Sequence, residues 1–182
     1  MRRTLAPLCR PICRPLWRPI CRALIRFGLL LPMPIGAQEP VPEAELKAAF
    51  IYNFALFTQW PQPAAASGLS FCIADSSALK AAVLRLAGKP VNDGLVTVKV
   101  MAAGDPAPED CGVWIVEPAS PMPPVERRGT LMVSDGGSLD GHVMIVLALD
   151  HSHVRFDIDT IAAQRAGLKF SSKLLRLARA TQ

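Results

Sequence analysis

The first clear pattern along the chain is helical. Four apolar residues follow one another at spacings of four, four and three positions: Leu46, Phe50, Phe54 and Phe57. This spacing places them on one face of an α-helix. Prolines and glutamates between residues 40 and 45 are typical of a helix start, because the first turn tolerates proline and the helix dipole favours carboxylates there. The residue before a proline is disfavoured in the α conformation, so we expect the helix to end at Trp60, before Pro61.

Beyond Pro61 the pattern changes to short apolar runs separated by turn residues. Four runs have the composition of buried strands: residues 70–75, 95–101, 111–117 and 130–135. Between the first two, Ser76 or Ser77 can cap a helix that runs to Ala87, before Gly88. A strand, a helix and a strand in series indicate a parallel pair.

The end of the chain has a different arrangement. Apolar runs at 143–149 and 154–158 are separated by only four polar residues, which favours an antiparallel hairpin over a helical crossover. Two short helices, at 160–165 and 172–180, follow on either side of Gly167. Together the elements predict an α/β fold with a mostly parallel sheet and flanking helices, closed by a C-terminal antiparallel hairpin and short helices.

Charge is distributed unevenly between the two ends of the chain. Residues 1–37 hold seven arginines and no acidic residue, which leaves 13 basic and 15 acidic residues beyond them. The basic stretch is followed by a short apolar run at 27–31 and by Ala37, a pattern that predicts a secretory signal peptide over 1–37, cleaved near Ala37. Residues 38–182 then form a single domain. The alternative is a cytosolic protein with a basic arm.

The near-neutral remainder of the chain argues against a nucleic-acid-binding protein, which would carry a basic patch on the folded domain. Three of the five cysteines lie in the predicted signal peptide, so only Cys72 and Cys111 remain beyond it. Two cysteines in an oxidising compartment usually pair, and we expect a disulfide between them in the periplasm. The alternative is two free core thiols. If strands 70–75 and 111–117 are neighbours, the disulfide ties them together.

No stretch of the sequence has the spacing of a catalytic site. Ser134 lacks the small flanking residues of a nucleophile elbow, and no phosphate-binding glycine pattern opens a helix. His151 and His153 alternate like residues on one strand face, with Asp150 and Asp157 nearby, but hairpin tips are commonly just polar. We therefore predict a protein that is not an enzyme and has no cofactor and no resident metal.

Two groups of side chains are candidates for contact with a partner. Tyr52 and Trp60 lie off the main apolar stripe of the first helix, and exposed aromatic residues are typical interface anchors. Arg165, Lys169 and Lys173 follow at steps of four and suit an acidic partner or anionic lipid. Core packing for Trp60 and an ordinary solvated face for the basic residues are the alternatives.

Both ends of the predicted domain resemble one family. LKAAFIYNFALFTQWP at 46–61 is similar to the opening helix of the YfiR family of periplasmic regulators, and AGLKFSSKLLRLA at 166–178 is similar to its closing segment. FCIAD, LAGKPVNDGLVTVKV and VRFDID lie between them in the expected order. Cys72 and Cys111 match one cysteine pair of the family, and the chain lacks the second pair that some members carry around the terminal hairpin.

The resemblance implies a repressor that binds the periplasmic part of an inner-membrane diguanylate cyclase and lowers cyclic-di-GMP synthesis, with an effect on biofilm. It also implies an outer-membrane lipoprotein that sequesters the repressor. Relatives can accompany sensor kinases instead, and a homodimer is left open. The second hypothesis belongs to another class: a periplasmic domain that senses a small molecule or a metal through its 135–153 loops and feeds a sensor kinase.

Overall fold

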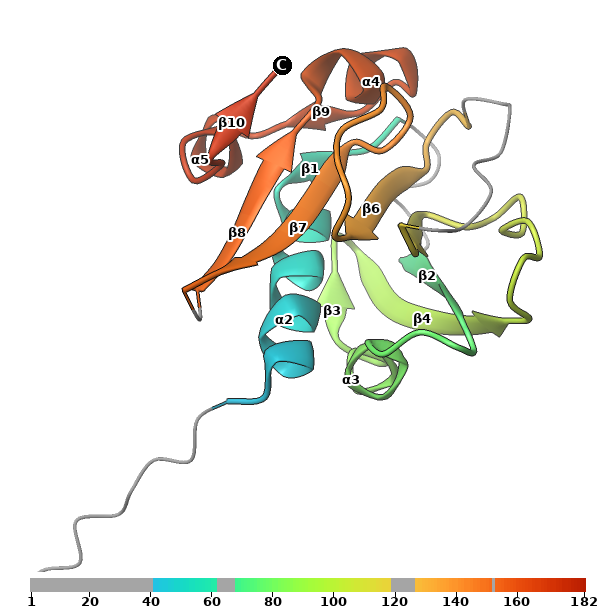
Figure 1. Cartoon of the computed structure of the whole chain (residues 1–182). Helices are drawn as coiled ribbons and strands as arrows, with labels where there is room; N and C mark the ends of the chain where they lie inside the picture. Colours follow the sequence, from blue (N-terminus) through green and yellow to red (C-terminus); the bar gives the residue numbers. More distant parts are fainter. Residues whose placement is uncertain (1–40, 62–67, 119–126, 152) are drawn as a thin grey trace, which may run out of the picture. The chain divides into compact units, whose positions relative to one another are not determined.

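The computed structural model describes residues 41–61, 68–118, 127–151 and 153–182, and an eight-stranded sheet runs through them. The predicted signal peptide lies outside the described residues. The strands lie side by side in the order β10, β8, β7, β6, β5, β2, β4, β3 (Figure 1). In chain order their bounds are β2 Leu69–Ala74, β3 Pro90–Val91, β4 Gly94–Met101, β5 Val113–Val116, β6 Leu131–Asp135, β7 Ile145–Asp150, β8 His153–Ile158 and β10 Ala180–Thr181.

The strand directions confirm the predicted mixed α/β fold with a mostly parallel sheet. Strands β4, β2, β5, β6 and β7 are parallel to their neighbours in this series, while β8 is antiparallel to β7. Strand β2 lies between β4 and β5, so the runs that hold Cys72 and Cys111 are neighbours. A separate two-stranded sheet pairs β1, Thr58–Gln59, with β9, Lys169–Phe170.

Helix α4 has the bounds that the sequence predicts, while α2, α3 and α5 are shorter. Their bounds are α2 Glu43–Leu56, α3 Lys80–Leu84, α4 Thr160–Arg165 and α5 Ser172–Leu175. Helix α2 ends before Trp60 because the next residues pair with β9. The Ser77 hydroxyl accepts from the Leu79 amide and holds a turn, which delays the start of α3. After α5 the chain leaves the helix, and the side chain of Arg179 pairs with that of Asp157 as the backbone enters β10.

All the described helices contribute to one core, on one face of the sheet. Phe71, Ile73 and Ile145 are fully buried there and pack with Ile51 and Phe54 of α2. The same core includes Val83 of α3, Ala163 of α4 and Leu174 of α5. Strand residues point alternately to the two faces, so this core accounts for only half of the side chains on the sheet.

The opposite face has a core of its own, to which no described helix contributes. Cys72, Trp114 and Met132 project from neighbouring strands and are buried there. Loop residues Ala107 and Val143 complete this second cluster. Among the described residues, the prediction of flanking helices therefore holds for one face only, because the described connections on the other face are loops. In the described part of the chain, no helix is both long and apolar enough to cross a membrane.

A buried ion pair attaches α2 to the end of β6. Lys47 is 8% exposed, and its Nζ lies 2.6 Å from an Asp135 carboxylate oxygen. Glu43, one turn earlier on α2, contacts the same ammonium group. Burial disfavours the charge on Lys47, but hydrogen bonds and attraction from both carboxylates outweigh it, so the pKa of Lys47 is raised.

We predict that Lys47→Met destabilises the protein by about 1–3 kcal/mol, because it leaves the partly buried Asp135 carboxylate without its cation. Because the folded-state pKa of Lys47 is raised, this contribution is present at neutral pH and is lost only as the pH rises through that pKa. Urea unfolding at pH 7 measures the loss. Lys80→Met is the control, because the Lys80 pair with Asp75 is exposed and contributes about 0–1 kcal/mol. Equal losses for the two variants would contradict this interpretation.

Candidate interaction surface

The segment from 102 to 112 makes a crossover over the face of the sheet that carries no described helix. Strands β4 and β5 are both parallel to β2, which lies between them, so the chain must return along the sheet after Met101 to begin β5 at Val113. In many α/β folds a helix makes this connection. Here a loop makes it, and Ala107 and Cys111 are its buried contacts with the second cluster.

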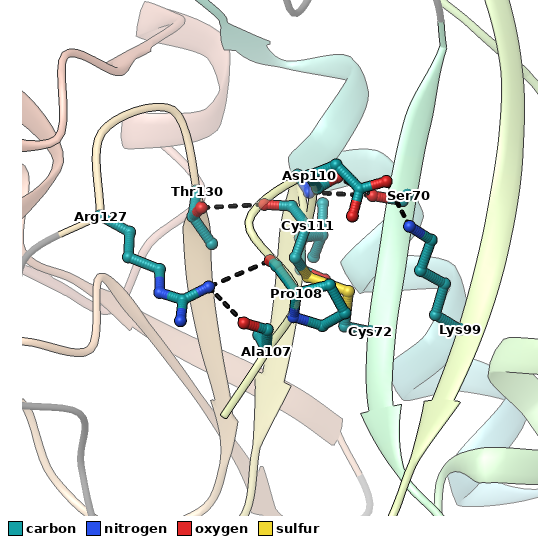
Figure 2. Close-up of a disulfide and its surroundings, with 11 residues drawn as sticks. Ser70, Cys72, Lys99, Ala107, Pro108, Asp110, Cys111, Arg127 and Thr130 are labelled. Atoms are coloured by element: carbon teal, nitrogen blue, oxygen red, sulfur yellow. Dashed lines mark hydrogen bonds and ion pairs between the residues drawn. A yellow bond between two sulfur atoms is a disulfide. The ribbon is translucent and has the colours of Figure 1, made fainter. Parts of the chain in front are cut away.

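A disulfide fastens the end of this crossover segment. It joins Cys111 to Cys72, whose Cα atoms are 6.1 Å apart (Figure 2). Cys72 lies inside β2 and Cys111 lies two residues before β5, so the bond connects two adjacent parallel strands. Both cysteines are buried, at 0% and 2% exposed, so the bond is part of the second core.

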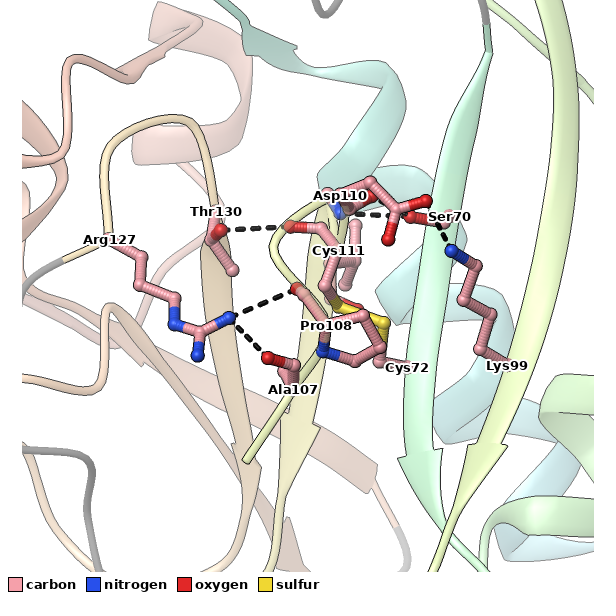
Figure 3. Close-up of polar contacts among 11 residues, drawn as sticks. Ser70, Cys72, Lys99, Ala107, Pro108, Asp110, Cys111, Arg127 and Thr130 are labelled. Atoms are coloured by element: carbon pink, nitrogen blue, oxygen red, sulfur yellow. Dashed lines mark hydrogen bonds and ion pairs between the residues drawn. A yellow bond between two sulfur atoms is a disulfide. The ribbon is translucent and has the colours of Figure 1, made fainter. Parts of the chain in front are cut away.

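Arg127 fastens the middle of the crossover segment. Its guanidinium group donates to the carbonyl oxygens of Ala107 and Pro108, the second at 3.0 Å (Figure 3). The same group lies 5.7 Å from the centre of the Trp114 ring, within reach of a cation–π interaction. The Thr130 hydroxyl donates to the Cys111 carbonyl at 2.8 Å. A loop without a helix thereby gains fixed partners for its backbone.

Charged side chains lie at the margin of this surface. Lys99 of β4 pairs with Asp110, and the Ser70 hydroxyl donates to the Asp110 carbonyl oxygen (Figure 3). The hydrogen bond from Lys99 lowers the pKa of the Asp110 carboxyl group. Both charged side chains are substantially exposed, so the pair is open to competition from an outside charge.

Trp60 and Tyr52, the two aromatic residues predicted to contact a partner, both make hydrogen bonds within the domain. Trp60 is 8% exposed, and its Nε1 donates to the Ala55 carbonyl oxygen at 3.2 Å. Its ring is therefore in the core, which corrects the expectation of an exposed anchor. The hydrogen bond holds the ring against the last turn of α2. Tyr52 is partly buried, and its hydroxyl donates to the Pro90 carbonyl oxygen, so it attaches α2 to β3.

The predicted basic row is divided among three elements. Arg165 lies at the end of α4 and donates to the Gly141 carbonyl at 2.7 Å. Lys169 lies in β9, and Lys173 in α5 lies 4.9 Å from the centre of the Phe57 ring. Gly167 has a positive φ of 76° and ends the helix between them, so the row is not one helix face. All three side chains are exposed, and their role in partner binding stays a prediction.

The histidine and aspartate side chains considered as a metal site at the hairpin do not come together around one point. His151 Nδ1 lies 2.6 Å from the Asp150 carboxylate, and His153 Nδ1 contacts a backbone carbonyl. Asp157 instead accepts from two nitrogens of Arg179, Nε and Nη2. Within the residues that the structure describes, no three His, Cys, Asp or Glu side chains are grouped to hold a metal.

A small pocket of about 160 Å³ lies where β5 and β6 end. Val116, Glu117, Ser134, Gly137 and Asp140 are among the residues that line it. Asp140 accepts from two backbone amides at 3.0 Å each, those of His142 and Val143. Burial raises the pKa of Asp140, but the amide donors outweigh burial and leave it lowered. Ligands of parallel α/β folds commonly bind at this end of the strands.

Sequence reasoning missed the polar residues that hold the crossover segment. Arg127, Thr130 and Ser70 donate to backbone carbonyls, and a backbone carbonyl leaves no signature in the sequence. Lys99 gives only a weak signal, as the one charged residue within a β-branched run.

Comparison with known proteins identifies a family. The model of the family described as YfiR/HmsC-like matches residues 44–179. This range contains both terminal segments quoted above and both disulfide cysteines, so the match spans most of the predicted domain. No curated protein matches the chain at a significant level.

We predict that Cys72→Ala combined with Cys111→Ala destabilises the protein by about 4 kcal/mol, the loop-closure value for a bond that spans 39 residues. Chemical denaturation of the two forms measures the difference. Because both cysteines are buried, we also expect a thiol reductant to leave the bond intact until the protein unfolds. Rapid reduction in the folded state, detected by alkylation and mass measurement, would contradict a purely structural bond.

Proposed function

Since its sequence matches the family model over residues 44–179, the chain belongs to the YfiR/HmsC-like family, and we propose that it is a periplasmic regulatory protein that represses an inner-membrane diguanylate cyclase by direct contact. The family match is the observation that carries this proposal. The family is regulatory rather than catalytic, and the disulfide is of the kind that persists in exported proteins.

Topology dictates how such a repressor acts. Cyclic-di-GMP is made on the cytoplasmic side of the inner membrane, and this protein would lie outside it. Its effect must therefore pass through a receiver that spans the membrane and has at least two states. The repressor lowers synthesis by binding the inactive state more tightly than the active one. A sensor kinase with a periplasmic domain is the alternative receiver, and an outer-membrane lipoprotein would compete for the repressor.

The two exposed lysines near the C-terminus are the best-placed candidates for the contact with the receiver. Lys169 and Lys173 lie on β9 and α5, next to the strand partner Gln59 and the ring of Phe57 respectively. Exposed lysine side chains attract an acidic surface electrostatically. At physiological salt this attraction extends over a Debye length of roughly 8 Å.

We expect deletion of the gene to raise cellular cyclic-di-GMP, and a copy with residues 1–37 to restore the original level. A copy that begins at residue 38 should fail, because it cannot reach the periplasm. Nucleotide extraction with mass spectrometry provides the measurement. The cyclase version of the proposal is wrong if deletion changes nothing and no membrane-spanning cyclase co-purifies with the exported protein.

Charge reversal tests the contact itself. Lys169→Glu with Lys173→Glu should reduce recovery of the receiver from a solubilised envelope fraction and raise cyclic-di-GMP, while the melting temperature stays the same. Lys80→Glu is the matched control, because Lys80 is a partly exposed lysine on α3 whose ion-pair partner among the described residues is Asp75. An equal effect of this control would show that general charge, and not this position, determines binding.

The pocket at the ends of β5 and β6 favours a second candidate function, the sensing of a small polar molecule. A ligand at a hundred times its dissociation constant would stabilise the fold by about 2.7 kcal/mol. A thermal-shift screen of small polar metabolites tests this. Ser138→Trp, which places a large side chain at the pocket lining, should abolish any shift that arises there. A shift that persists in this variant would place the ligand elsewhere.

A further inference from the structure

Charge is divided unevenly between the C-terminal segment and the rest of the predicted domain. All 15 acidic residues of the chain lie between positions 38 and 159, together with eight basic residues. The segment 160–182 has no acidic residue and carries five basic ones: Arg165, Lys169, Lys173, Arg176 and Arg179. It forms α4, β9, α5 and β10, which gather at one end of the domain in Figure 1. The domain is therefore electrically polarised, with a net positive charge on this segment.

The two acidic residues that precede this segment already have partners. The Asp157 carboxylate accepts from Arg179 Nε at 2.9 Å and also from its Nη2. Asp159 is 5% exposed, and its carboxylate accepts at 2.8 Å from a backbone amide in the first turn of α4. Three exposed cations of the segment make no ion pair with a described residue: Lys169, Lys173 and Arg176. Their charge is available to an outside anion.

Cationic and aliphatic side chains share the outer face of the α5 turn. Lys173 is followed by Arg176 and Leu177 at steps of three and four, a spacing that places them on one helical face. The helical turn includes these residues, because the Arg176 amide donates to the Ser172 carbonyl and the Leu177 amide to the Leu174 carbonyl. Leu174 points the other way and is buried in the core. Leu177 is 62% exposed, so this face presents an aliphatic side chain beside two cations.

Helix α4 repeats this arrangement. Ile161 is 58% exposed, and Arg165 follows it at a step of four, on the same helical face. Ala162 and Ala163 are buried. Ile161 and Leu177 are two of the three most exposed large apolar side chains in the described part of the chain. Aliphatic side chains among cations are typical of a surface that lies on a membrane.

We propose that Arg176, Leu177 and Ile161 form a surface that rests on the anionic phospholipids of a membrane, beside the two lysines assigned to the receiver. Arg176 binds headgroup phosphates, while the two aliphatic side chains enter the boundary between headgroups and acyl chains. The inference rests on the proposed function only for the choice of membrane. That membrane is the one that holds the receiver, approached from its periplasmic side.

The distribution of the cations favours lipid as the occupant. They lie on three separate short elements and not along one helix face. Headgroups diffuse laterally and can meet cations at any such spacing, whereas an acidic peptide must match them in sequence. Few cations and two aliphatic side chains give a reversible contact, far weaker than a membrane-spanning helix. Confinement to the membrane raises the effective concentration of the repressor around its receiver.

Vesicle flotation tests the contact. The exported protein should float with phosphatidylglycerol vesicles and not with phosphatidylcholine vesicles, and 0.5 M salt, about five times the ionic strength at which the Debye length is 10 Å, should weaken the binding. Overall charge would not account for this binding, because residues 38–182 hold 15 acidic and 13 basic residues. Arg176→Glu should lower the partition coefficient at least tenfold. Lys80→Glu, the same change of charge on α3, should leave it almost unchanged.

Fluorescence tests whether position 177 enters the lipid. The native Trp60 and Trp114 are buried, so Leu177→Trp adds an exposed indole whose emission should shift to shorter wavelength with anionic vesicles. Lipids brominated on their acyl chains should quench it. Leu149→Trp is the control, because Leu149 is 48% exposed and lies in β7 near the hairpin tip, away from the residues of β8 that pair with β10. The control should show neither effect.

The outcomes separate this proposal from the proposed function. No flotation with anionic vesicles, or equal losses for Arg176→Glu and Lys80→Glu, would overturn the membrane contact. Recovery of the receiver by a protein that binds no vesicle would also overturn it, and would assign the surface to protein contact alone. Flotation with the expected losses supports the membrane contact, even if deletion of the gene leaves cyclic-di-GMP unchanged and the cyclase version fails.

Discussion

The sheet of this protein has two buried faces but, among the described residues, helices on only one of them. On the other face, among the described residues, loops cover the buried side chains of Trp114, Met132 and Cys72, and the segment from 102 to 112 contributes Ala107 and Cys111. A loop can exclude water there only if it is held in place and its backbone groups have partners. The disulfide holds the end of the 102–112 segment, and Arg127 holds its middle by donating to two carbonyl groups. The second core, and with it the packing of β5 and β6, depends on these two attachments.

This dependence connects the fold to the compartment. A disulfide between adjacent central strands forms and persists where the surroundings are oxidising. Its burial also protects it from exchange with external thiols. The bond therefore serves stability in the folded protein, and a family role in the periplasm is consistent with it.

Several charged side chains bind groups within the domain instead of extending freely into solvent. Lys47 joins α2 to β6, Arg179 joins the last strand to β8, and Arg165 donates to a loop carbonyl. Part of the surface charge therefore serves contacts within the fold.

Local patterns were sufficient for much of the fold. The apolar stripe of α2, the four parallel strand segments and the terminal hairpin were evident from periodicity, because helix and strand repeats are properties of neighbouring residues. The two cysteines and the family segments were equally visible. Only the tertiary structure decided that the helices share one face, that Trp60 turns inward and that Arg127 holds the crossover segment. Those outcomes depend on contacts between residues far apart in the chain, above all with backbone carbonyls, which every residue carries and no sequence pattern marks.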